Sequence, residues 1–528
     1  MVGSHKKKKN LPIGSWPKFL IHLVMVIFRD GFFWLVMDFV GGGFATGIID
    51  LGGGLLVSQI TTFNKVWTIF EGGANNLGVT FFEPTGLSEG FFMLGCYCQP
   101  NNMPLHGWVL VGKDNSSLSN GALAKPVDYN LVWTTRSLKT KQDEEGYIWL
   151  PIAPDEYKPV GYVVTTSPEK PSLDRIRCVR SDLTDECTRY NSMKLWRTES
   201  KRFGVFDVRP MKRGIGAQGV SVGTFLAQSG GGTNPKPLPI VCLKNTKASF
   251  SYMPNLSQVE AMIKAYSPYM YLHPMEEYLP SSVDWFFSNG AVLMEKRKGV
   301  IGENAIRANG SNLPQGGSFD DGVTYWLDLP LDEAKRVKVK KGDLASAEAY
   351  VHVKPMLGGS FSDIVMWVFY PFNGGARAKV ACTNITLRGK GEHVGDWEHV
   401  TLRVSNFNGE LWKVYLSQHS RGEWVDACEL EFQNGNRVVA YSSLHGHALF
   451  PKTGLVMQGM RGLGVRNDAA KSDAVMDMAN GFQIVGAEYL GSEIREPPWL
   501  NYCMNWGPKN GPKGPKHKDS WEGDERCK

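Results

Sequence analysis

The chain has 528 residues, enough for several domains, and 42% of them are hydrophobic, which is ordinary for a globular protein. The formal net charge of +6 is local. Residues 6–9 supply four units, and the tail at residues 509–528 supplies two more, from six Lys and Arg against four Asp and Glu. The rest of the chain is close to neutral, which argues against an extended nucleic-acid-binding surface, so we expect no nucleic-acid partner.

Residues 1–42 are a basic and apolar N-terminal extension. Its two apolar stretches, residues 19–28 and 31–37, are each shorter than the roughly 20 residues that a helix needs to cross a bilayer. A helix that joined them would bury the adjacent Arg29 and Asp30, which is costly. The basic run before the first stretch also resembles a signal peptide, but no convincing cleavage site follows. We expect an extension that contacts a membrane surface or has little structure, rather than a spanning helix.

Three stretches in the first half share a pattern of a tryptophan, then a proline-containing run, then a glycine. The tryptophans Trp67, Trp133 and Trp196 lie 66 and 63 residues apart, a regularity typical of an internal repeat. Each stretch is rich in short aromatic and β-branched runs separated by Pro, Gly and Asn. We therefore predict a β repeat domain with three repeats at residues 43–245, with the three tryptophans in equivalent buried positions. As an array, the repeats offer an edge or groove for a peptide or protein partner.

The second half, residues 250–508, is predicted as a second β-sandwich domain with short helices. A capping-box pattern at residues 257–260 predicts a helix that runs to about Tyr266 and stops before Pro268. The strands are predicted at residues 348–352, 364–370, 398–404, 411–416 and 438–442. The fold class is therefore mostly β: a β-sandwich-like repeat array followed by a second β-sandwich domain, with a charged flexible tail at residues 509–528.

For one hairpin in the second half, the register in which its two strands pair can also be predicted. Residues 407–409, Phe-Asn-Gly, predict a three-residue loop with Gly409 at positive φ. A two-residue loop would place Val404 against Lys413, which the apolar pattern disfavours. The longer loop predicts the cross-strand pairs Val404–Trp412, Leu402–Val414 and Glu398–Gln418.

The nine cysteines are scattered, odd in number and contain no Cys-x-x-Cys pattern. This usage predicts free thiols in a reducing compartment, hence a cytosolic protein. Four Asn-x-Ser/Thr sequons leave a secreted protein as the alternative.

The strongest candidate site lies at residues 391–399. His393, Asp396 and Glu398 stand at offsets of zero, three and five, where a strand begins. Because side chains alternate along a strand, both carboxylates share the face of Val400 and the apolar residues after it. Inward carboxylates are costly unless they are paired, and a divalent cation is the simplest partner. A hydrogen-bonded corner that only shapes the loop is compatible with the same spacing.

Histidines gather around this motif. Five of the eleven histidines fall within 55 residues, which favours a site. The residues that we expect to bind a ligand or to support the motif are His399, Gln418, His419, His445 and His447. Oxygen-rich coordination would favour magnesium, calcium or manganese, and more histidines would favour zinc.

No nucleophile elbow, phosphate-binding loop with Lys or His-Glu-x-x-His pattern is present in the sequence. We therefore assign no catalytic residue and rank a non-enzymatic binding protein above an enzyme. The alternative is a metal-dependent hydrolase or related enzyme in which Glu398 or His399 acts as the general base near a metal-bound water.

The chain resembles the plant members of the vacuolar protein sorting-associated protein 62 family over roughly residues 43–508. The matching runs include Ile-Asp-Leu-Gly-Gly at residues 49–53, Thr-Ser-Pro-Glu-Lys-Pro at residues 166–171 and Ser-Ser-Leu-His-Gly-His at residues 442–447. The resemblance implies a link to vacuolar protein sorting, hence a peripheral place on endomembranes, and no established biochemical activity.

Two further resemblances concern the halves separately. The tryptophan repeats are similar to the adaptor-binding repeats of chorein-type lipid-transfer proteins, which implies recognition of short peptide motifs. Residues 391–399 resemble the heptapeptide motif of the necrosis- and ethylene-inducing-like toxins, which hold a divalent cation and bind sphingolipid head groups. This implies His393, Asp396 and Glu398 as metal ligands, with Asn373 in place of a further toxin Asp, and a lipid head group or glycan as the ligand.

Overall fold

The computed structural model describes residues 24–28, 31–35 and 43–523, with gaps at 118–119, 137–140, 199–202, 230–236, 248–250, 316–322, 381–382, 388, 420, 461–462 and 509–510. The chain divides into two compact units, Met1–Gly41 and Gly42–Lys528. In the first, β1 (Val24–Phe28) pairs antiparallel with β2 (Gly31–Leu35); the rest of the predicted extension lies outside the described residues. Among the helices that the structure describes, none is both long and apolar enough to cross a bilayer.

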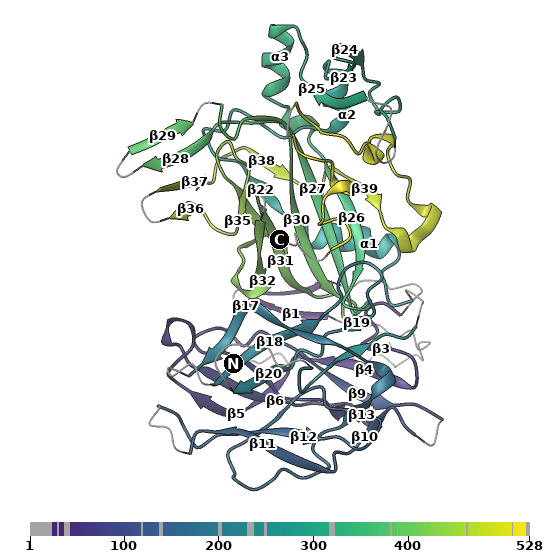
Figure 1. Ribbon diagram of the computed structural model, residues 1–528, viewed down its shortest axis with the longest axis vertical. Helices are drawn as coiled ribbons and strands as arrows, with labels where there is room; N and C mark the ends of the chain where they lie inside the picture. The colour runs from purple at the N-terminus through teal and green to yellow at the C-terminus, as the bar shows by residue number, and fades with distance from the viewer. Residues whose placement is uncertain are drawn as a thin grey trace, which may run out of the picture. The chain divides into compact units, whose positions relative to one another are not determined.

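The second unit is mostly β, as predicted from the sequence, and its helices are short (Figure 1). Its first half contains three three-stranded antiparallel sheets. They are β5 (Phe63–Ile69), β6 (Val79–Pro84) and β8 (Tyr97–Pro100); β11 (Asp128–Thr134), β12 (Tyr147–Ile152) and β14 (Val163–Thr165); and β17 (Cys187–Arg197), β18 (Phe203–Pro210) and β20 (Phe225–Ser229).

Three further sheets complete the first half. They are β3 (Ile48–Asp50), β4 (Leu55–Ile60), β9 (Val109–Asp114) and β7 (Phe92–Met93); β10 (Leu123–Ala124), β15 (Cys178–Arg180) and β13 (Tyr157–Lys158); and β16 (Thr184–Asp185), β21 (Cys242–Lys244) and β19 (Gly219–Val220). Aromatic residues from the first three sheets share one apolar core.

The three spaced tryptophans each stand beside a shift in strand register, in β5, β11 and β17. The ring of Trp133 lies 6.1 Å from that of Trp67 and 5.6 Å from that of Trp196, measured between centroids. Trp67 and Trp196 are buried, as predicted, and their indole N–H groups donate to backbone carbonyls at 2.9 and 2.7 Å. Trp133 is only half-buried, so the prediction of three equally buried tryptophans is wrong at that position. Its ring stacks instead on Phe203 at 4.3 Å.

The second half is organised around a six-stranded sheet, ordered β32-β31-β30-β27-β26-β39 (Figure 1). Its strands are β32 (Arg421–Asp426), β31 (Leu411–Gln418), β30 (His393–Ser405), β27 (Phe361–Asn373), β26 (Ala349–Met356) and β39 (Phe482–Gly486). The two central strands, β27 and β30, have 13 residues each and are almost wholly buried. Four of the five strands predicted from the sequence are therefore members of this sheet. The fifth is β34 (Arg437–Ser442).

Smaller elements surround this sheet. One further sheet joins β34 to β33 (Phe432–Gln433), β22 (Tyr269–Tyr271), β38 (Val475–Asp477) and β35 (Leu449–Phe450). Another contains β24 (Val300–Ala305), β23 (Val292–Arg297) and β25 (Val323–Asp328), and a third contains β29 (Thr383–Leu387), β28 (Ala376–Val380), β37 (Leu463–Ala469) and β36 (Gly454–Met460). The α-helices are α1 (Leu256–Tyr266), α2 (Val283–Ser288) and α3 (Glu333–Lys340).

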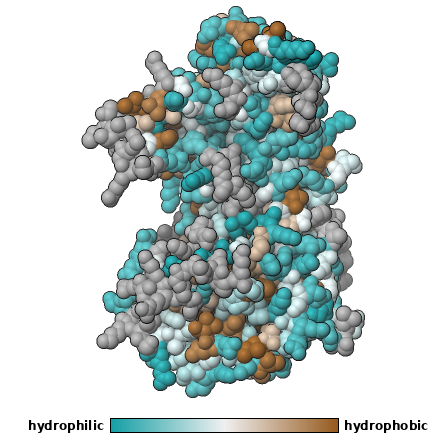
Figure 2. Space-filling view, viewed as in Figure 1, coloured by the Kyte–Doolittle hydropathy of each residue, from teal (hydrophilic) through white to brown (hydrophobic). Residues whose placement is uncertain are grey.

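The surface shown in Figure 2 is mostly hydrophilic, with separate hydrophobic patches. Exposed large apolar residues include Leu455, Val456 and Met457 on the edge strand β36.

Helix α1 ends at Tyr266, as predicted, but it begins earlier than the predicted cap at residue 257 implies. The N-cap is Asn255, whose side chain accepts from the backbone N–H of Gln258, while the Gln258 side chain accepts from the backbone N–H of Asn255. The capping box therefore begins two residues before the predicted one. The reason is that Asn is as good an N-cap as Ser, and Gln serves as well as Glu at the third helical position.

The predicted hairpin forms with a bulge. Gly409 has a φ of +74° and Leu402 pairs with Val414, both as predicted. A register shift after Arg403 then places Val404 opposite Leu411 rather than Trp412. Apolar side chains remain opposite one another, because the bulge exchanges one apolar partner for another. The described ladder between β30 and β31 begins at Val400 and Leu416, so the pair Glu398–Gln418 is not part of it.

Two predictions about the chain's chemistry and its end require correction. Cys187 and Cys242 form a disulfide, with Cα atoms 5.4 Å apart, so these two cysteines are not the free thiols that their scattered spacing predicted. Spacing carries no information on this pair, because strands β17 and β21 bring residues 55 positions apart together. The tail is anchored up to Trp521, whose buried ring stacks on His352 at 3.7 Å between centroids.

Candidate functional site

The predicted motif lies at one end of the two central strands. In the ladder between β27 and β30, Asn373 pairs with His393, and Tyr370 pairs with Asp396. Asp396 and Glu398 are buried, with 8% and 3% of their surfaces exposed. They share strand parity with Val400, as the alternation of side chains predicted. The fold therefore places two carboxylates at adjacent positions on one buried face.

Asp396 is paired with a histidine from a distant loop. The Nδ1 atom of His447 lies 3.0 Å from Oδ2 of Asp396. Burial alone would raise the pKa of Asp396, but the hydrogen bond from His447 and the charges of His393 and His447 hold it well below its usual range. Burial lowers the pKa of His447, but the hydrogen bond to Asp396 and the nearby carboxylates of Glu276 and Glu398 raise it above its ordinary value. The two groups form a buried ion pair.

Glu398 has a different environment. Burial and the charge of Asp396 raise the pKa of Glu398 to about 7, although His419 and Lys518 act in the opposite direction. Its Oε2 accepts a hydrogen bond from the hydroxyl of Ser417, which itself accepts from the backbone N–H of His399 at 2.8 Å. Burial beside a second carboxylate therefore favours the neutral form of Glu398.

A third buried carboxylate, Glu276, was not foreseen from the sequence. It accepts from the backbone N–H of His445 at 2.5 Å and lies 3.4 Å from the Nδ1 atom of that residue. Burial raises its pKa, but the hydrogen bond from His445 and the charge of His447 outweigh burial and lower the pKa below its ordinary value. Glu276 follows β22 in an irregular loop, where no periodicity or motif distinguishes it from the neighbouring Glu277.

The remaining predicted residues divide into two groups. At the site, Nδ1 of His393 lies 2.8 Å from the carbonyl of Gly395, and the amide of Asn373 donates to the carbonyls of Gly391 and Gly374 at 2.7 and 2.9 Å. His419 lies 3.0 Å from the amide oxygen of Asn467, and Gln418 donates to the carbonyl of Leu449 at 3.2 Å.

His399 lies away from the site. It has the opposite strand parity to Asp396 and Glu398, and its ring packs against Trp367 at 4.4 Å and Tyr415 at 5.4 Å. Its contribution to the site is through the backbone N–H that donates to Ser417. The prediction that its side chain supports a ligand site is therefore corrected, because alternation along β30 turns that side chain toward the other face.

Three of the site's histidines have an unusual backbone conformation. His419, His445 and His447 have φ angles of +58°, +66° and +55°. Side chains other than Gly are uncommon in this region, and such strain persists where the surrounding structure compensates for it, as at functional sites. The sequence carried no sign of this shared conformation.

The side chains of this cluster include chemical groups that commonly bind divalent cations. Asp396, Glu398 and Glu276 offer carboxylate oxygens, and magnesium, calcium and manganese prefer such ligands. Within the ranges that the structure describes, however, no three His, Cys, Asp or Glu side chains are grouped as metal ligands. The carboxylates instead accept hydrogen bonds from His447, Ser417 and His445, which a bound cation would have to replace in part.

The fold and this cluster define a large β-rich protein with a buried acidic site. Over residues 35–510, the chain matches the model of the family described as vacuolar protein sorting-associated protein 62. The chain belongs to this family, whose name associates it with vacuolar protein sorting. No curated protein sequence matches the chain.

Several solved structures are similar to parts of the chain. GNIP1Aa from Chromobacterium piscinae is 21% identical with a TM-score of 0.31, over 40% of this chain and 40% of that protein. NLPPya in complex with glucosamine is 12% identical with a TM-score of 0.21, over 43% of this chain and 79% of that one. Necrosis and Ethylene inducing Protein 2, from the causal agent of cocoa's Witches Broom disease, is 10% identical with a TM-score of 0.20, over 44% of this chain and 76% of that one.

The neighbours of NLPPya type are the toxins that residues 391–399 resemble in sequence. The chain spans only 40% of the length of GNIP1Aa. TM-scores of 0.31 or less support no inference about activity or ligands.

Proposed function

We propose that the protein is a non-enzymatic binding protein linked to vacuolar sorting or membrane trafficking, which holds a divalent cation at its acidic cluster and binds a glycan or lipid head group there. The observation that supports the cation is the adjacent buried pair Asp396 and Glu398. Burial and the charge of Asp396 raise the pKa of Glu398 to about 7, so these carboxylates repel one another. A divalent cation would remove this repulsion and bind the ionised form of both.

The cluster is not wholly closed to solvent. Asp396 retains 11% side-chain exposure and His445 retains 20%. His393, Gln418 and His419 are half-buried around them. Such a rim of imidazole and amide groups offers hydrogen-bond donors and acceptors to a polar head group or sugar. Asp396 and Glu398 would hold the cation, and the half-buried side chains would contact the ligand.

The β repeats of residues 43–245 have a proposed role of their own. We propose that they engage a peptide or protein partner at the cytosolic face of endomembranes. Membership of a family named for vacuolar protein sorting supports this assignment. The resemblance of the tryptophan repeats to adaptor-binding repeats is the sequence observation behind it.

One observation favours a second candidate, a metal-dependent hydrolase. A carboxyl group whose pKa is about 7 is well suited to accept and return a proton near neutral pH. In this alternative, Glu398 would be the general base for a water molecule that the cation activates. The binding proposal ranks first because it requires only the cation and the polar rim.

Metal analysis of the purified protein tests the primary proposal. Wild type is compared with Asp396→Ala and Glu398→Gln, and with Asp128→Asn as a control at an exposed carboxylate on β11. We expect magnesium, calcium, manganese or zinc to raise the melting temperature of wild type and the control. Neither site variant should respond, and both should contain less metal. Equal metal content in all four proteins would refute the cation site.

Turnover separates the two candidates. Wild type and Glu398→Gln are incubated with glycans, esters and phosphoesters in the presence of the metal that binds. Loss of ligand binding in the variant, with no product from either protein, supports the binding protein. Metal-dependent product formation by wild type that is absent from the variant would establish the hydrolase instead.

A further inference from the structure

The four-stranded sheet β29-β28-β37-β36 carries a group of exposed apolar side chains. We call these four strands the arm. In Figure 1 its two hairpins project from the rest of the second half, and in Figure 2 hydrophobic residues gather on it. The exposed apolar residues, each with 36–46% of its surface accessible, are Ile385 on β29, Val465 on β37 and Leu455, Val456 and Met457 on β36.

The register of the strands joins these side chains into one surface. Ala378 of β28 pairs with both Ile385 and Val465, and Val465 pairs with Gln458 of β36. Paired residues point to the same face of a sheet, and so does Val456, two positions from Gln458. Three exposed aliphatic side chains therefore share one face across the whole width of the arm. Contiguous apolar groups of this kind mark interaction surfaces.

The arm is also strongly basic. Residues 376–390 and 452–469, which contain its strands, have seven Lys and Arg and a single Asp, an excess of six positive charges. That one acid, Asp468, accepts from Arg377 at 2.9 Å and from Arg466 at 2.7 Å. One carboxylate thus serves two guanidinium groups, and a net positive charge remains. Such a surface attracts an anionic partner.

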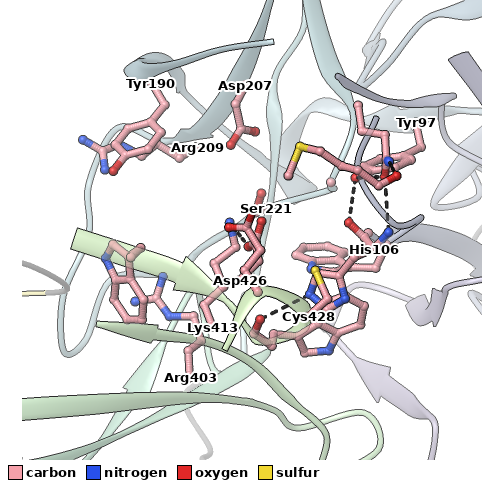
Figure 3. A pocket seen from close by; sticks show the side chains of 18 of the residues that line it. Tyr97, His106, Tyr190, Asp207, Arg209, Ser221, Arg403, Lys413, Asp426 and Cys428 are labelled. Carbon is pink, nitrogen blue, oxygen red and sulfur yellow. Dashed lines mark hydrogen bonds and ion pairs between the residues drawn. The ribbon is translucent and has the colours of Figure 1, made fainter. Parts of the chain in front are cut away.

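Other polar surfaces of the same unit mix the two signs of charge. The cavity of about 430 Å³ shown in Figure 3 contains both basic and acidic side chains, and Lys413 pairs there with Asp426 at 3.0 Å. On the arm, Lys390 and Lys452 are exposed near the ends of the strands. The combination of exposed aliphatic and basic side chains therefore distinguishes the arm.

We propose that the arm docks on the surface of a membrane that contains anionic phospholipids. Its basic side chains are attracted by the head groups, and its aliphatic side chains enter the boundary between head groups and acyl chains. Strand β36 is an edge strand, and its outer backbone groups would lack partners deep in hydrocarbon. The arm therefore docks at the level of the head groups, where water reaches that edge. This role goes beyond the proposed function and requires neither the cation site nor the β repeats.

Two other kinds of partner fit this surface less well. Residues 376–390 and 452–469 contain no aromatic residue, whereas single-stranded nucleic acids are bound by aromatic stacking as well as by charge. A peptide strand added to β36 would cover Leu455 and Met457. It would leave Ile385 uncovered, because β29 is the opposite edge, about 14 Å away across three strand spacings. A lipid surface contacts both edges at once.

The test is flotation of the full chain with vesicles in the presence of EDTA. The vesicles contain phosphatidylcholine alone, or phosphatidylcholine with phosphatidylserine as one quarter of the lipid. Wild type should bind the second kind only, and less well as the salt concentration rises. Leu455→Gln with Val456→Thr removes apolar contact, and Lys390→Gln with Lys452→Gln removes two charges. We expect each double variant to lose at least tenfold in partitioning.

Matched controls lie in the first half of the chain. Leu131→Gln with Val127→Thr alters apolar residues that are 46% and 58% exposed, and Lys158→Gln with Lys212→Gln removes two exposed lysines. Both controls should bind vesicles as wild type does. Melting curves establish that all variants are folded.

Thiol labelling locates the contact. Anionic vesicles should slow the alkylation of the thiol introduced by Val456→Cys at least fivefold, as read by peptide mass spectrometry. They should leave that of the exposed Cys428 unchanged. Several results would overturn the proposal: no binding to vesicles, equal binding to both kinds, binding that neither arm variant weakens, or equal losses in the controls. Light scattering that shows a dimer disrupted by the arm variants, or binding only of acidic peptides or nucleic acid, would also overturn it.

Discussion

His447 donates from Nδ1 to Oδ2 of Asp396 over 3.0 Å, although 51 positions separate the two residues. The imidazole ring also lies flat on Tyr370, with ring centroids 3.8 Å apart and planes 7° from parallel. Tyr370 is the ladder partner of Asp396 across β27 and β30. One histidine is thus held by two adjacent strand positions, and its positive φ of +55° is maintained by these contacts.

Replacing Asp396 with Asn tests this pairing. The amide keeps the shape but not the charge, so a buried imidazolium loses its counter-ion. We expect a loss of about 3 kcal/mol in the free energy of unfolding at pH 6, measured with urea. The pKa of His447 should fall, because the carboxylate of Asp396 helps to raise it.

A double-mutant cycle with His447→Gln separates the pair from the rest of the cluster. The coupling energy should shrink as pH rises through the pKa of His447, since the neutral imidazole no longer requires a charged partner. Additive effects of the two substitutions at pH 6 would show that the contact contributes no stability.

The sequence predicted the elements of the second half better than their exact pairing. Alternation of apolar residues identifies β30 and β31 and places Asp396 and Glu398 on one buried face. The bulge after Arg403 has no such signal, because Leu411 and Trp412 are both apolar and either suits Val404. Register at a bulge is decided by local packing, which the two-residue period does not encode.

The candidate site could be predicted where its residues belong to a recognisable motif or to the group of histidines near it. The motif from His393 to Glu398 carries a recognisable spacing, and the histidines of residues 445 and 447 were expected near it. Glu276 comes from a loop 120 positions before Asp396, and only the fold brings it to the cluster.

Stability at acidic pH should depend on His352. This residue is fully buried, donates from Nε2 to Glu488 at 3.0 Å, and has no partner at Nδ1 among the described residues. Burial lowers its pKa to about 4, although Glu488 acts in the opposite direction. The unfolded chain, with a histidine pKa of about 6.5, therefore binds the proton more tightly.

The stabilising contribution of His352 is present above pH 6.5 and is lost as pH falls toward 4, up to about 3 kcal/mol. Urea titrations at pH 7.5, 5.5 and 4.5 measure the loss. His352→Gln should be less stable than wild type at pH 7.5 and should lose less stability on acidification. Parallel pH profiles for the two proteins would contradict the assignment.

A side chain added at Gly409 in the hairpin loop should find enough room, but it should strain the backbone. At Gly409, a Cβ atom would come no closer than 3.8 Å to Phe44, which is ordinary contact. Its φ of +74° is unfavourable for other residues, so Gly409→Ala should cost about 1–2 kcal/mol. Gly409→Asn should cost less, because Asn adopts this conformation more readily. Equal costs for both variants, measured by thermal and urea unfolding, would argue against backbone strain.

Two ion pairs on neighbouring strands should differ in strength because they differ in burial. Asp363 is fully buried, and Arg403 donates to both of its oxygens. Arg403→Met leaves that carboxylate without a counter-charge, so we expect a loss of about 3–5 kcal/mol in the free energy of unfolding. Lys413 pairs with Asp426 with side chains 30% and 22% exposed, so Lys413→Met should cost about 1 kcal/mol or less. Urea unfolding of both variants measures the difference, and similar losses would show that burial does not set the strength of these pairs.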